Sequence, residues 1–222
     1  MSDPAFIPYH RERLDESEMR RRGETLFDEL SHRRSVRHFT SEPVSRDLIE
    51  LAIRIACTAP SGAHRQPWKF VAVSDNEIKS QIRVAAEEEE RLSYEGRMSS
   101  EWLQALEPIG TDWQKPFLET VPWIVVVFEE LYEVGPQGQQ IKNYYVKESV
   151  GIACGMFITA LHQMGLAMLT QTPSPMAFLS KILQRPGNER PFILFPIGYP
   201  AKDATVPNLY RKSLDEIATF IE

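Results

Sequence analysis

The chain has 222 residues, of which 42% are hydrophobic, and its formal net charge is −6. This length and composition indicate one globular domain with a full core and exclude extensive disorder. The acidic balance argues against a nucleic-acid partner, because a phosphate backbone requires a basic face.

Apolar windows and cysteines bear on the cellular compartment. Residues 123–128 and 151–169 are too short or too interrupted by polar residues to span a membrane, and residues 1–30 hold no apolar signal core. We therefore expect a cytoplasmic protein with no membrane partner. Cys57 and Cys154 lie in apolar helical patterns without metal-ligand spacing, so we interpret both as small core residues and expect no metal site.

Hydrophobic periodicity predicts helices interleaved with strands. Helical spacing occurs over residues 16–31, 45–57, 145–164 and 177–183, and Ser74 to Glu77 has the capping-box spacing that begins a further helix. Short apolar runs predict strands at 69–73, 123–128, 167–172 and 191–197. Residues 87–120 carry no long regular stripe, so we interpret them as a partly helical lid. The pattern indicates a single α+β or α/β domain over residues 1–222.

Two motifs admit both an ordinary and a functional interpretation. The segment TAPSGAHRQPW at 58–68 is either a plain helix-to-strand connection or a backbone-rich loop around a planar polar ligand. The run RRSVR at 33–37 is either a solvated charge cluster or a phosphate site, because arginine offers a planar fork of donors. Neither a GxGxxG motif nor a GxxxxGK[ST] motif is present.

These two motifs, with TQTP at 170–173 and PNLYRK at 207–212, resemble the FMN-dependent nitroreductase superfamily. Within it the resemblance is to the iodotyrosine deiodinases, of a soluble bacterial type, over residues 33–212. It implies an α+β nitroreductase-like fold with a central mixed sheet flanked by helices, assembled as an intertwined homodimer. Residues 1–30 would form an N-terminal arm and helix, 87–120 a substrate lid, and 200–222 an extension that reaches the partner subunit.

The resemblance also implies an FMN site. Its residues would be Arg33, Arg34, Ser35, Arg37, Ser61, Gly62, Thr170, Gln171, Thr172 and Arg211. The catalytic residue would be Thr172, whose hydroxyl hydrogen-bonds flavin N5 and tunes electron transfer. Gln171 stands where the family often has threonine, and its effect is open.

A second implied set binds the substrate. Glu90, Tyr94 and Lys115 would clamp an amino-acid zwitterion, and the backbone N–H of Ala63 would hold its phenolate oxygen. The implied reaction is reductive dehalogenation of mono- and diiodotyrosine to tyrosine and halide by stepwise one-electron transfer. Taken singly, each of the three lid residues is also explained as surface decoration.

Two other functions remain open. A broad NAD(P)H-dependent nitroreductase or quinone reductase would share the FMN residues but have no need of Glu90, Tyr94 and Lys115. A flavin carrier or ligand-binding protein would bind halotyrosine without turning it over. The electron donor is expected to be NAD(P)H or a separate reductase.

Overall fold

The computed structural model of the protein describes residues 6–222, which fall into two units divided after Arg33. The first unit contains helix α1 (Glu16–Ser31), which is capped by Asp15, whose side chain accepts the N–H of Glu18 at 2.9 Å. None of the residues of α1 is buried within the chain.

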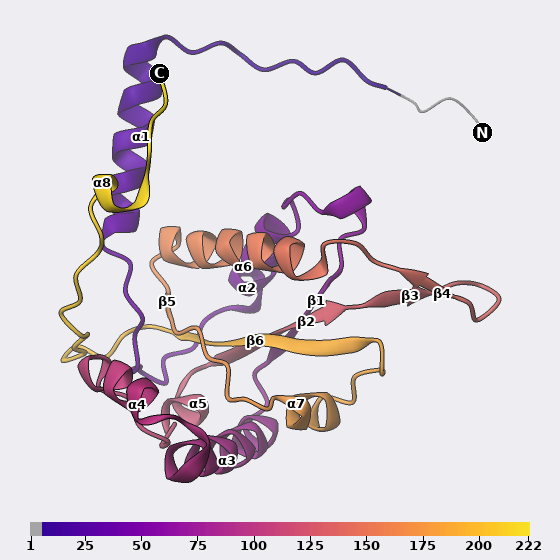
Figure 1. Cartoon of the computed structure of the whole chain (residues 1–222), viewed down its shortest axis with the longest axis vertical. Coiled ribbons are helices and arrows are strands. Elements are labelled where there is room, and N and C mark those ends of the chain that lie inside the picture. Colours follow the sequence, from indigo (N-terminus) through magenta and orange to yellow (C-terminus); the bar gives the residue numbers. More distant parts are fainter. Residues whose placement is uncertain (1–5) are drawn as a thin grey trace. The chain divides into compact units, whose positions relative to one another are not determined.

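The second unit is built on a four-stranded sheet (Figure 1). Its spatial order is β1-β2-β6-β5, formed by β1 (Trp68–Val73), β2 (Trp123–Glu130), β6 (Glu189–Gly198) and β5 (Ala167–Met168). All three strand pairs are antiparallel, so the mixed sheet expected from the resemblance is wrong for these strands. The parallel pairing that the structure does describe is an isolated bridge from Ser35 to Met168.

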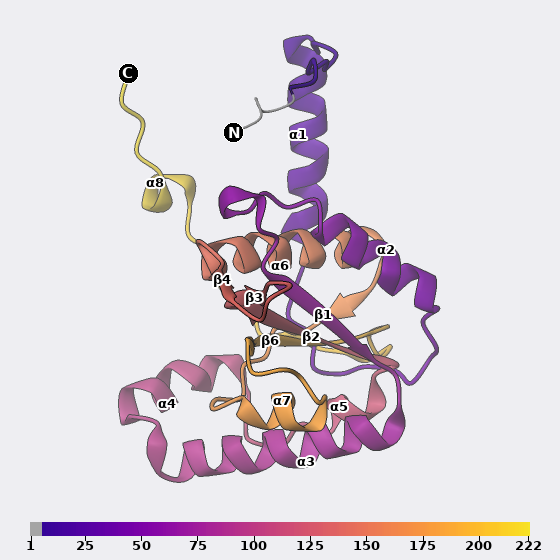
Figure 2. The same cartoon turned by 90° about the vertical axis from the view of Figure 1, so that its right-hand side faces the viewer.

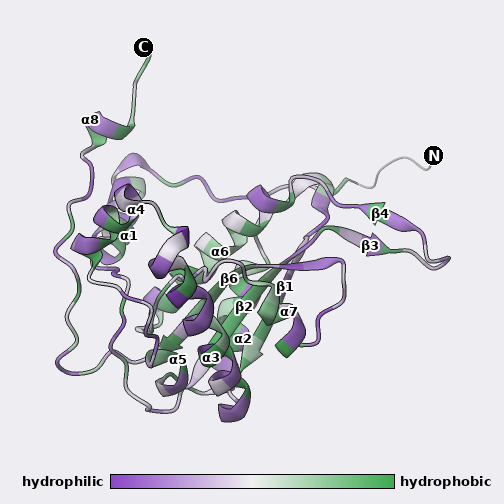
Figure 3. Cartoon of the chain, turned by 60° about the horizontal axis from the view of Figure 1, so that its bottom comes forward, coloured by the Kyte–Doolittle hydropathy of each residue, from purple (hydrophilic) through white to green (hydrophobic). Residues whose placement is uncertain are grey.

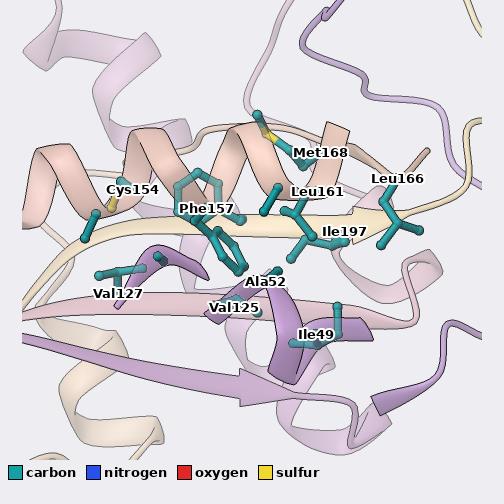
Figure 4. Packing of buried hydrophobic residues seen from close by; sticks show 14 of the residues in the cluster. Ile49, Ala52, Val125, Val127, Cys154, Phe157, Leu161, Leu166, Met168 and Ile197 are labelled. Carbon is teal, nitrogen blue, oxygen red and sulfur yellow. The ribbon is translucent and has the colours of Figure 1, made fainter. Parts of the chain in front are cut away.

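Two helices cover one face of this sheet. Helix α2 (Arg46–Ala56) packs on α6 (Val146–Gln163), and both contribute to a core with the strands beneath them. Figure 4 shows Phe157 and Leu161 of α6 pointing toward Val125 and Ile197 of the sheet. Burial of such large apolar side chains stabilises the fold by about 1.5–3 kcal/mol each.

The opposite face carries a second core (Figure 2). Its helices are α3 (Asn76–Leu92), α5 (Phe117–Thr120) and α7 (Ala177–Ile182). Figure 3 shows the sheet as a largely hydrophobic layer, with polar residues on the outer surfaces of the helices. Strand β2 lies between the two cores, and its residues from Ile124 to Phe128 are fully buried, as its β-branched run predicts.

The remaining elements lie at the margins of the second unit. They are the lid helix α4 (Ser100–Leu106), the hairpin strands β3 (Tyr132–Val134) and β4 (Gln140–Lys142), and the C-terminal helix α8 (Leu214–Ile217). The two hairpin strands were not predicted from the sequence, and residues 135–139 form the turn between them.

Three local expectations need correction. The residue that caps the start of α3 is Asp75, not Ser74, because the Asp75 carboxylate accepts the N–H of Ile78 at 2.9 Å. The predicted strand 167–172 stops being regular after Met168, since the chain next meets Pro196, which has no N–H to donate. Cys57 caps the end of α2 and is exposed, whereas Cys154 is buried as predicted.

Candidate active site

A cavity of about 500 Å³ lies between the end of strand β5 and the helices of the lid. This volume is in the range of small-molecule sites in proteins. Its wall combines charged, hydroxyl and apolar side chains from distant parts of the sequence: Arg37, Glu90, Ser93, Tyr94, Arg97, Met98, Trp102, Leu106, Thr111, Lys115, Phe117, Leu169, Thr170, Gln171, Thr172, Ser174 and Pro175.

One wall is the irregular continuation of strand β5. The N–H of Val36 donates to the carbonyl of Met168 at 3.2 Å, which aligns the segment containing Arg37 with the residues after β5. Gln171 exchanges two backbone hydrogen bonds with Leu194, at 3.0 and 2.9 Å, and so fixes this segment to β6. Thr170 and Thr172, on either side of Gln171, are exposed. A half-buried guanidinium and two hydroxyls therefore share one wall.

Gln171 itself is the unusual residue of that wall. The residue is only 7% exposed, and among the described atoms neither its Oε1 nor its Nε2 has a hydrogen-bond partner. A buried carboxamide without partners costs about 1–3 kcal/mol. The position that the sequence marks as a departure from the family is therefore a site of unsatisfied polarity.

The opposite wall begins where α3 changes its winding. After Leu92 the chain makes a π-turn over Ser93–Arg97 (η2), closed by the N–H of Met98 donating to the carbonyl of Ser93 at 2.9 Å. Such turns occur frequently at functional sites. Tyr94 lies on this turn, and its hydroxyl donates to the carbonyl of Thr111 at 3.1 Å.

Glu90 and Lys115 form a buried ion pair on this wall. The Lys115 Nζ lies 3.6 Å from the Glu90 Oε2, with side chains 5% and 15% exposed respectively. The same ammonium donates to the carbonyl of Asp112. Glu90 and Tyr94, which are four residues apart, thus meet the distant Lys115 at one cavity.

Burial sets the protonation behaviour of this pair. It raises the pKa of Glu90 above its usual value, and the nearby Lys115 opposes that rise. Burial likewise lowers the pKa of Lys115, against the attraction of Glu90. Burial also raises the pKa of Tyr94, with a further contribution from the Glu90 charge. The phenol is therefore a neutral hydrogen-bonding group at neutral pH.

The 58–68 loop lies elsewhere. Ala63, His64 and Gln66 have left-handed φ values of 50°, 54° and 48°, a concentration of backbone strain that is rare for residues other than glycine. Gly62 donates its N–H to the Ser149 Oγ at 3.3 Å, and a Cβ on Gly62 would meet Tyr145 at 2.7 Å. In the chain as described, Ser61, Gly62 and Ala63 do not line the cavity that holds Thr172.

The predicted phosphate cluster is not gathered around this cavity either. Arg33 belongs to the N-terminal unit. Within residues 34–222, the wall includes Arg37 but not Arg34, Ser35 or Arg211, and both Arg34 and Arg211 are exposed. Their assignment to a phosphate stays a prediction.

The apolar part of the lid was not predicted from the sequence. Met98, Trp102 and Leu106 line the cavity beside the π-turn. Trp102 and Leu106 lie on α4 at i and i+4, and this spacing in a polar stretch is the signal that would have identified them as one helical stripe, whereas Met98 lies in the extended link before α4. These side chains give the site a surface suited to an aromatic ring.

Two kinds of feature are absent from residues 6–222. No helix in this part of the chain is long and apolar enough to cross a membrane. Within the same residues, no group of three or more His, Cys, Asp and Glu side chains is arranged to hold a metal ion.

Comparison with known proteins places the chain. The Nitroreductase family model matches residues 30–199. The iodotyrosine deiodinase of Haliscomenobacter hydrossis is 57% identical over 98% of this chain and 97% of its own length. Iodotyrosine deiodinase 1 of Homo sapiens is 41% identical over 97% of this chain and 75% of its own length.

A solved structure agrees with these relatives. The crystal structure of oxidized iodotyrosine deiodinase bound to FMN and 3-iodo-L-tyrosine matches with a TM-score of 0.75 at 30% identity, covering 88% of this chain and 100% of that chain. The chain therefore belongs to the nitroreductase family and stands among its iodotyrosine deiodinase relatives.

Proposed function

We propose that this chain is an FMN-dependent iodotyrosine deiodinase, which converts mono- and diiodotyrosine to tyrosine and iodide. The observation that carries the proposal is the buried pair of Glu90 and Lys115 in the same cavity as Thr172. The relatives at 57% and 41% identity support the proposal, because both are iodotyrosine deiodinases and both match nearly the whole of this chain. A broad nitroreductase has no need of a paired carboxylate and ammonium in its substrate cavity.

The side chains of the cavity fit a flavin. Arg37 brings a positive charge to the wall, and the exposed Thr170 and Thr172 bring hydroxyls to a strand end beside it. These are the donor types that hold the polar edge of an isoalloxazine or the chain leading to its phosphate. When bound, FMN supplies two electrons, one at a time. The overall change takes up these electrons and one proton, replaces a C–I bond with C–H and releases iodide.

The lid residues recognise the amino-acid head group in this proposal. Glu90 binds the substrate ammonium, Lys115 binds its carboxylate, and Tyr94 adds a hydrogen bond. Met98, Trp102 and Leu106 then cover the substrate ring and exclude water. Because Glu90 and Lys115 already neutralise each other, a zwitterion replaces their mutual attraction without adding net charge to the site.

Thr172 and Ala63 act on the reacting part of the substrate and cofactor. The Thr172 hydroxyl holds a hydrogen bond at flavin N5, which tunes the cofactor for one-electron steps. The backbone N–H of Ala63 donates to the phenolate oxygen of the substrate. The left-handed backbone at Ala63 holds that N–H in a preset direction.

We propose further that a homodimer completes this site. The 58–68 loop does not line the cavity of its own chain, so a second copy has to supply it. The C-terminal segment supports this assembly, because its apolar side chains Leu214, Ile217, Phe220 and Ile221 are all exposed in a single chain. Sedimentation of the full chain should give a dimer, and removal of residues 213–222 should weaken both the dimer and FMN retention.

An anaerobic assay tests the function. The FMN-loaded protein is reduced with dithionite, and iodide release from mono- and diiodotyrosine is measured. Lys115→Gln protein with the same FMN content is the matched control. Rapid turnover of nitroaromatics with NAD(P)H and no iodide release would instead identify a nitroreductase. Tight halotyrosine binding without turnover of the reduced protein would identify a carrier.

A further inference from the structure

Lys115 is anchored by its backbone as well as by its side chain. Its N–H donates to the Glu87 Oε1 at 2.6 Å, and its carbonyl accepts the N–H of Leu118 at 3.0 Å, which begins α5. The following Pro116 restricts the backbone of Lys115 to extended conformations. The lysine that faces the cavity is thus held by its main chain on both sides.

Glu87 is itself held in place. Arg83, one turn earlier on α3, donates its Nε to the Glu87 Oε1 at 2.9 Å and its Nη1 to the Glu119 Oε2 at 3.0 Å. The Glu87 side chain is only 16% exposed, so water competes weakly for its oxygens. The carboxylate therefore links α3 to the start of α5 at the point where Lys115 sits.

The spacing of the acidic and phenolic side chains explains the arrangement. Glu87, Glu90 and Tyr94 follow one another at i, i+3 and i+7, so they share one face of α3 and its π-turn. Each of them reaches the segment 111–115: Glu87 at the N–H of Lys115, Glu90 at its ammonium, and Tyr94 at the carbonyl of Thr111. Glu87 is the member of this row that does not line the cavity.

We propose that Glu87 is a positioning residue for substrate recognition: by accepting the N–H of Lys115, it fixes the backbone from which the ammonium reaches the substrate carboxylate. The role rests on the proposed deiodinase function. A lysine side chain loses conformational entropy when it binds a ligand. A backbone that is already fixed before binding lowers this entropic cost.

Three variants test the assignment. Glu87→Ala removes the acceptor, Glu87→Gln keeps an oxygen in the same place without the charge, and Glu119→Ala removes the other partner of Arg83 without touching Lys115. For each FMN-loaded variant, the Kd for 3-iodotyrosine is measured by flavin fluorescence, KM and kcat by iodide release, and the Kd for FMN separately.

We expect Glu87→Ala to raise the Kd and KM for 3-iodotyrosine about tenfold, which corresponds to about 1.4 kcal/mol, with little change in kcat or FMN affinity. Glu87→Gln should stay within about threefold of wild type, and Glu119→Ala should match wild type. An unchanged Kd in Glu87→Ala, equal losses of FMN and 3-iodotyrosine affinity, or a Glu87→Gln variant as impaired as Glu87→Ala would each overturn the assignment.

Amide hydrogen exchange without substrate separates this inference from the proposed function. The Lys115 amide should be protected in wild type and in Glu87→Gln but exchange faster in Glu87→Ala, since its acceptor is then lost. If wild type failed to bind or dehalogenate 3-iodotyrosine, the proposed function would fall, whereas this exchange pattern would still decide whether Glu87 holds Lys115. Equal protection in Glu87→Ala and wild type would remove the anchoring role.

Discussion

Glu90 and Lys115 face each other with 3.6 Å between the Oε2 and Nζ atoms, in a wall where both side chains are largely shielded from water. Either charge left alone in such surroundings is strongly destabilising. A ligand that carries both an ammonium and a carboxylate satisfies both groups, whereas a simple acid or amine leaves one of them without a partner. Under the proposed function, the pair would thereby select for the complete amino-acid head group.

Lys115→Gln tests this selection. We expect the affinity for 3-iodotyrosine to fall by about 2–5 kcal/mol, because the substrate carboxylate loses its counter-charge in a buried site. FMN affinity should change by less than about twofold. Fluorescence titration measures both constants, and parallel losses of the two affinities would show that Lys115 supports the fold instead of the substrate.

The pH dependence of binding follows from the shifted pKa values. Under the proposed function, binding of the substrate zwitterion requires ionised Glu90 and protonated Lys115. The pKa of Glu90 is raised and that of Lys115 is lowered, in both cases mainly by burial. As the pH falls, the affinity for 3-iodotyrosine should begin to decline while the pH is still above about 4.3, the ordinary pKa of a glutamate. As the pH rises, the affinity should begin to decline while the pH is still below about 10.4, the ordinary pKa of a lysine. 2-Iodophenol, which has no head group, serves as the control for ionisation of the phenol.

The raised pKa of Glu90 also affects the free energy of unfolding. An ordinary salt-bridged carboxylate has a lowered pKa, so the two have pH dependences of opposite sign. Between its unfolded and raised folded pKa, the native state keeps a proton that the unfolded chain has released. The contribution of Glu90 to the free energy of unfolding therefore falls as pH rises through this interval. Comparison of wild type with Glu90→Gln in urea at several pH values measures it, and a difference between the two proteins that is independent of pH would contradict the shift.

Gln171→Met tests the unsatisfied carboxamide. Methionine has nearly the same length, and it removes two buried polar atoms that have no partner among the described residues. We expect the free energy of unfolding to rise by about 1 kcal/mol in urea denaturation without ligand. The matched control is Gln137→Met in the exposed hairpin turn, which should lie within about 0.5 kcal/mol of wild type. A less stable Gln171→Met protein would show that the carboxamide has a partner.

Thr172→Ala tests the hydroxyl proposed for flavin N5. We expect the kcat of iodide release to fall at least about tenfold, because the lost hydrogen bond lies at the reacting atom of the flavin. FMN affinity should change little, because this hydrogen bond is one of many that hold the cofactor. Thr172→Ser, which keeps the hydroxyl, should recover most of the rate. Full activity in Thr172→Ala would exclude this role.

The sequence predicted those parts of the fold whose signal is local. Strand β2 was evident from its β-branched run, because burial on both faces permits little else. The hairpin β3 and β4 was missed, since its strands are short and depend on distant contacts such as the Asn188 side chain donating to the carbonyl of Tyr132 at 2.7 Å. The shortness of β5 depends on Pro196 in a neighbouring strand, which no reading of residues 167–172 reveals.

The site residues likewise divide into those that the sequence predicts and those that only the folded chain reveals. The spacing of Glu90 and Tyr94 is local, and the structure does bring both residues to one cavity with Lys115. The role of Glu87 could not be predicted from the sequence, since its contact with Lys115 joins residues 28 positions apart. The lack of hydrogen-bond partners for the Gln171 carboxamide could not be predicted either, because burial and the absence of a partner are properties of the packed chain.

The π-turn at Ser93–Arg97 makes the lid sensitive to its own length. It holds one residue more than an α-helical turn would, and each residue of an α-helix turns the chain by about 100°. Deletion of one residue here would restore regular winding and turn the rest of η2 by about 100°, which would move Arg97 off the cavity wall. The extended residues Met98 and Ser99 separate this turn from α4, so Trp102 and Leu106 would keep their own winding. The polar and the apolar linings of the lid therefore lie on separate segments, and each can change in evolution while the other stays the same.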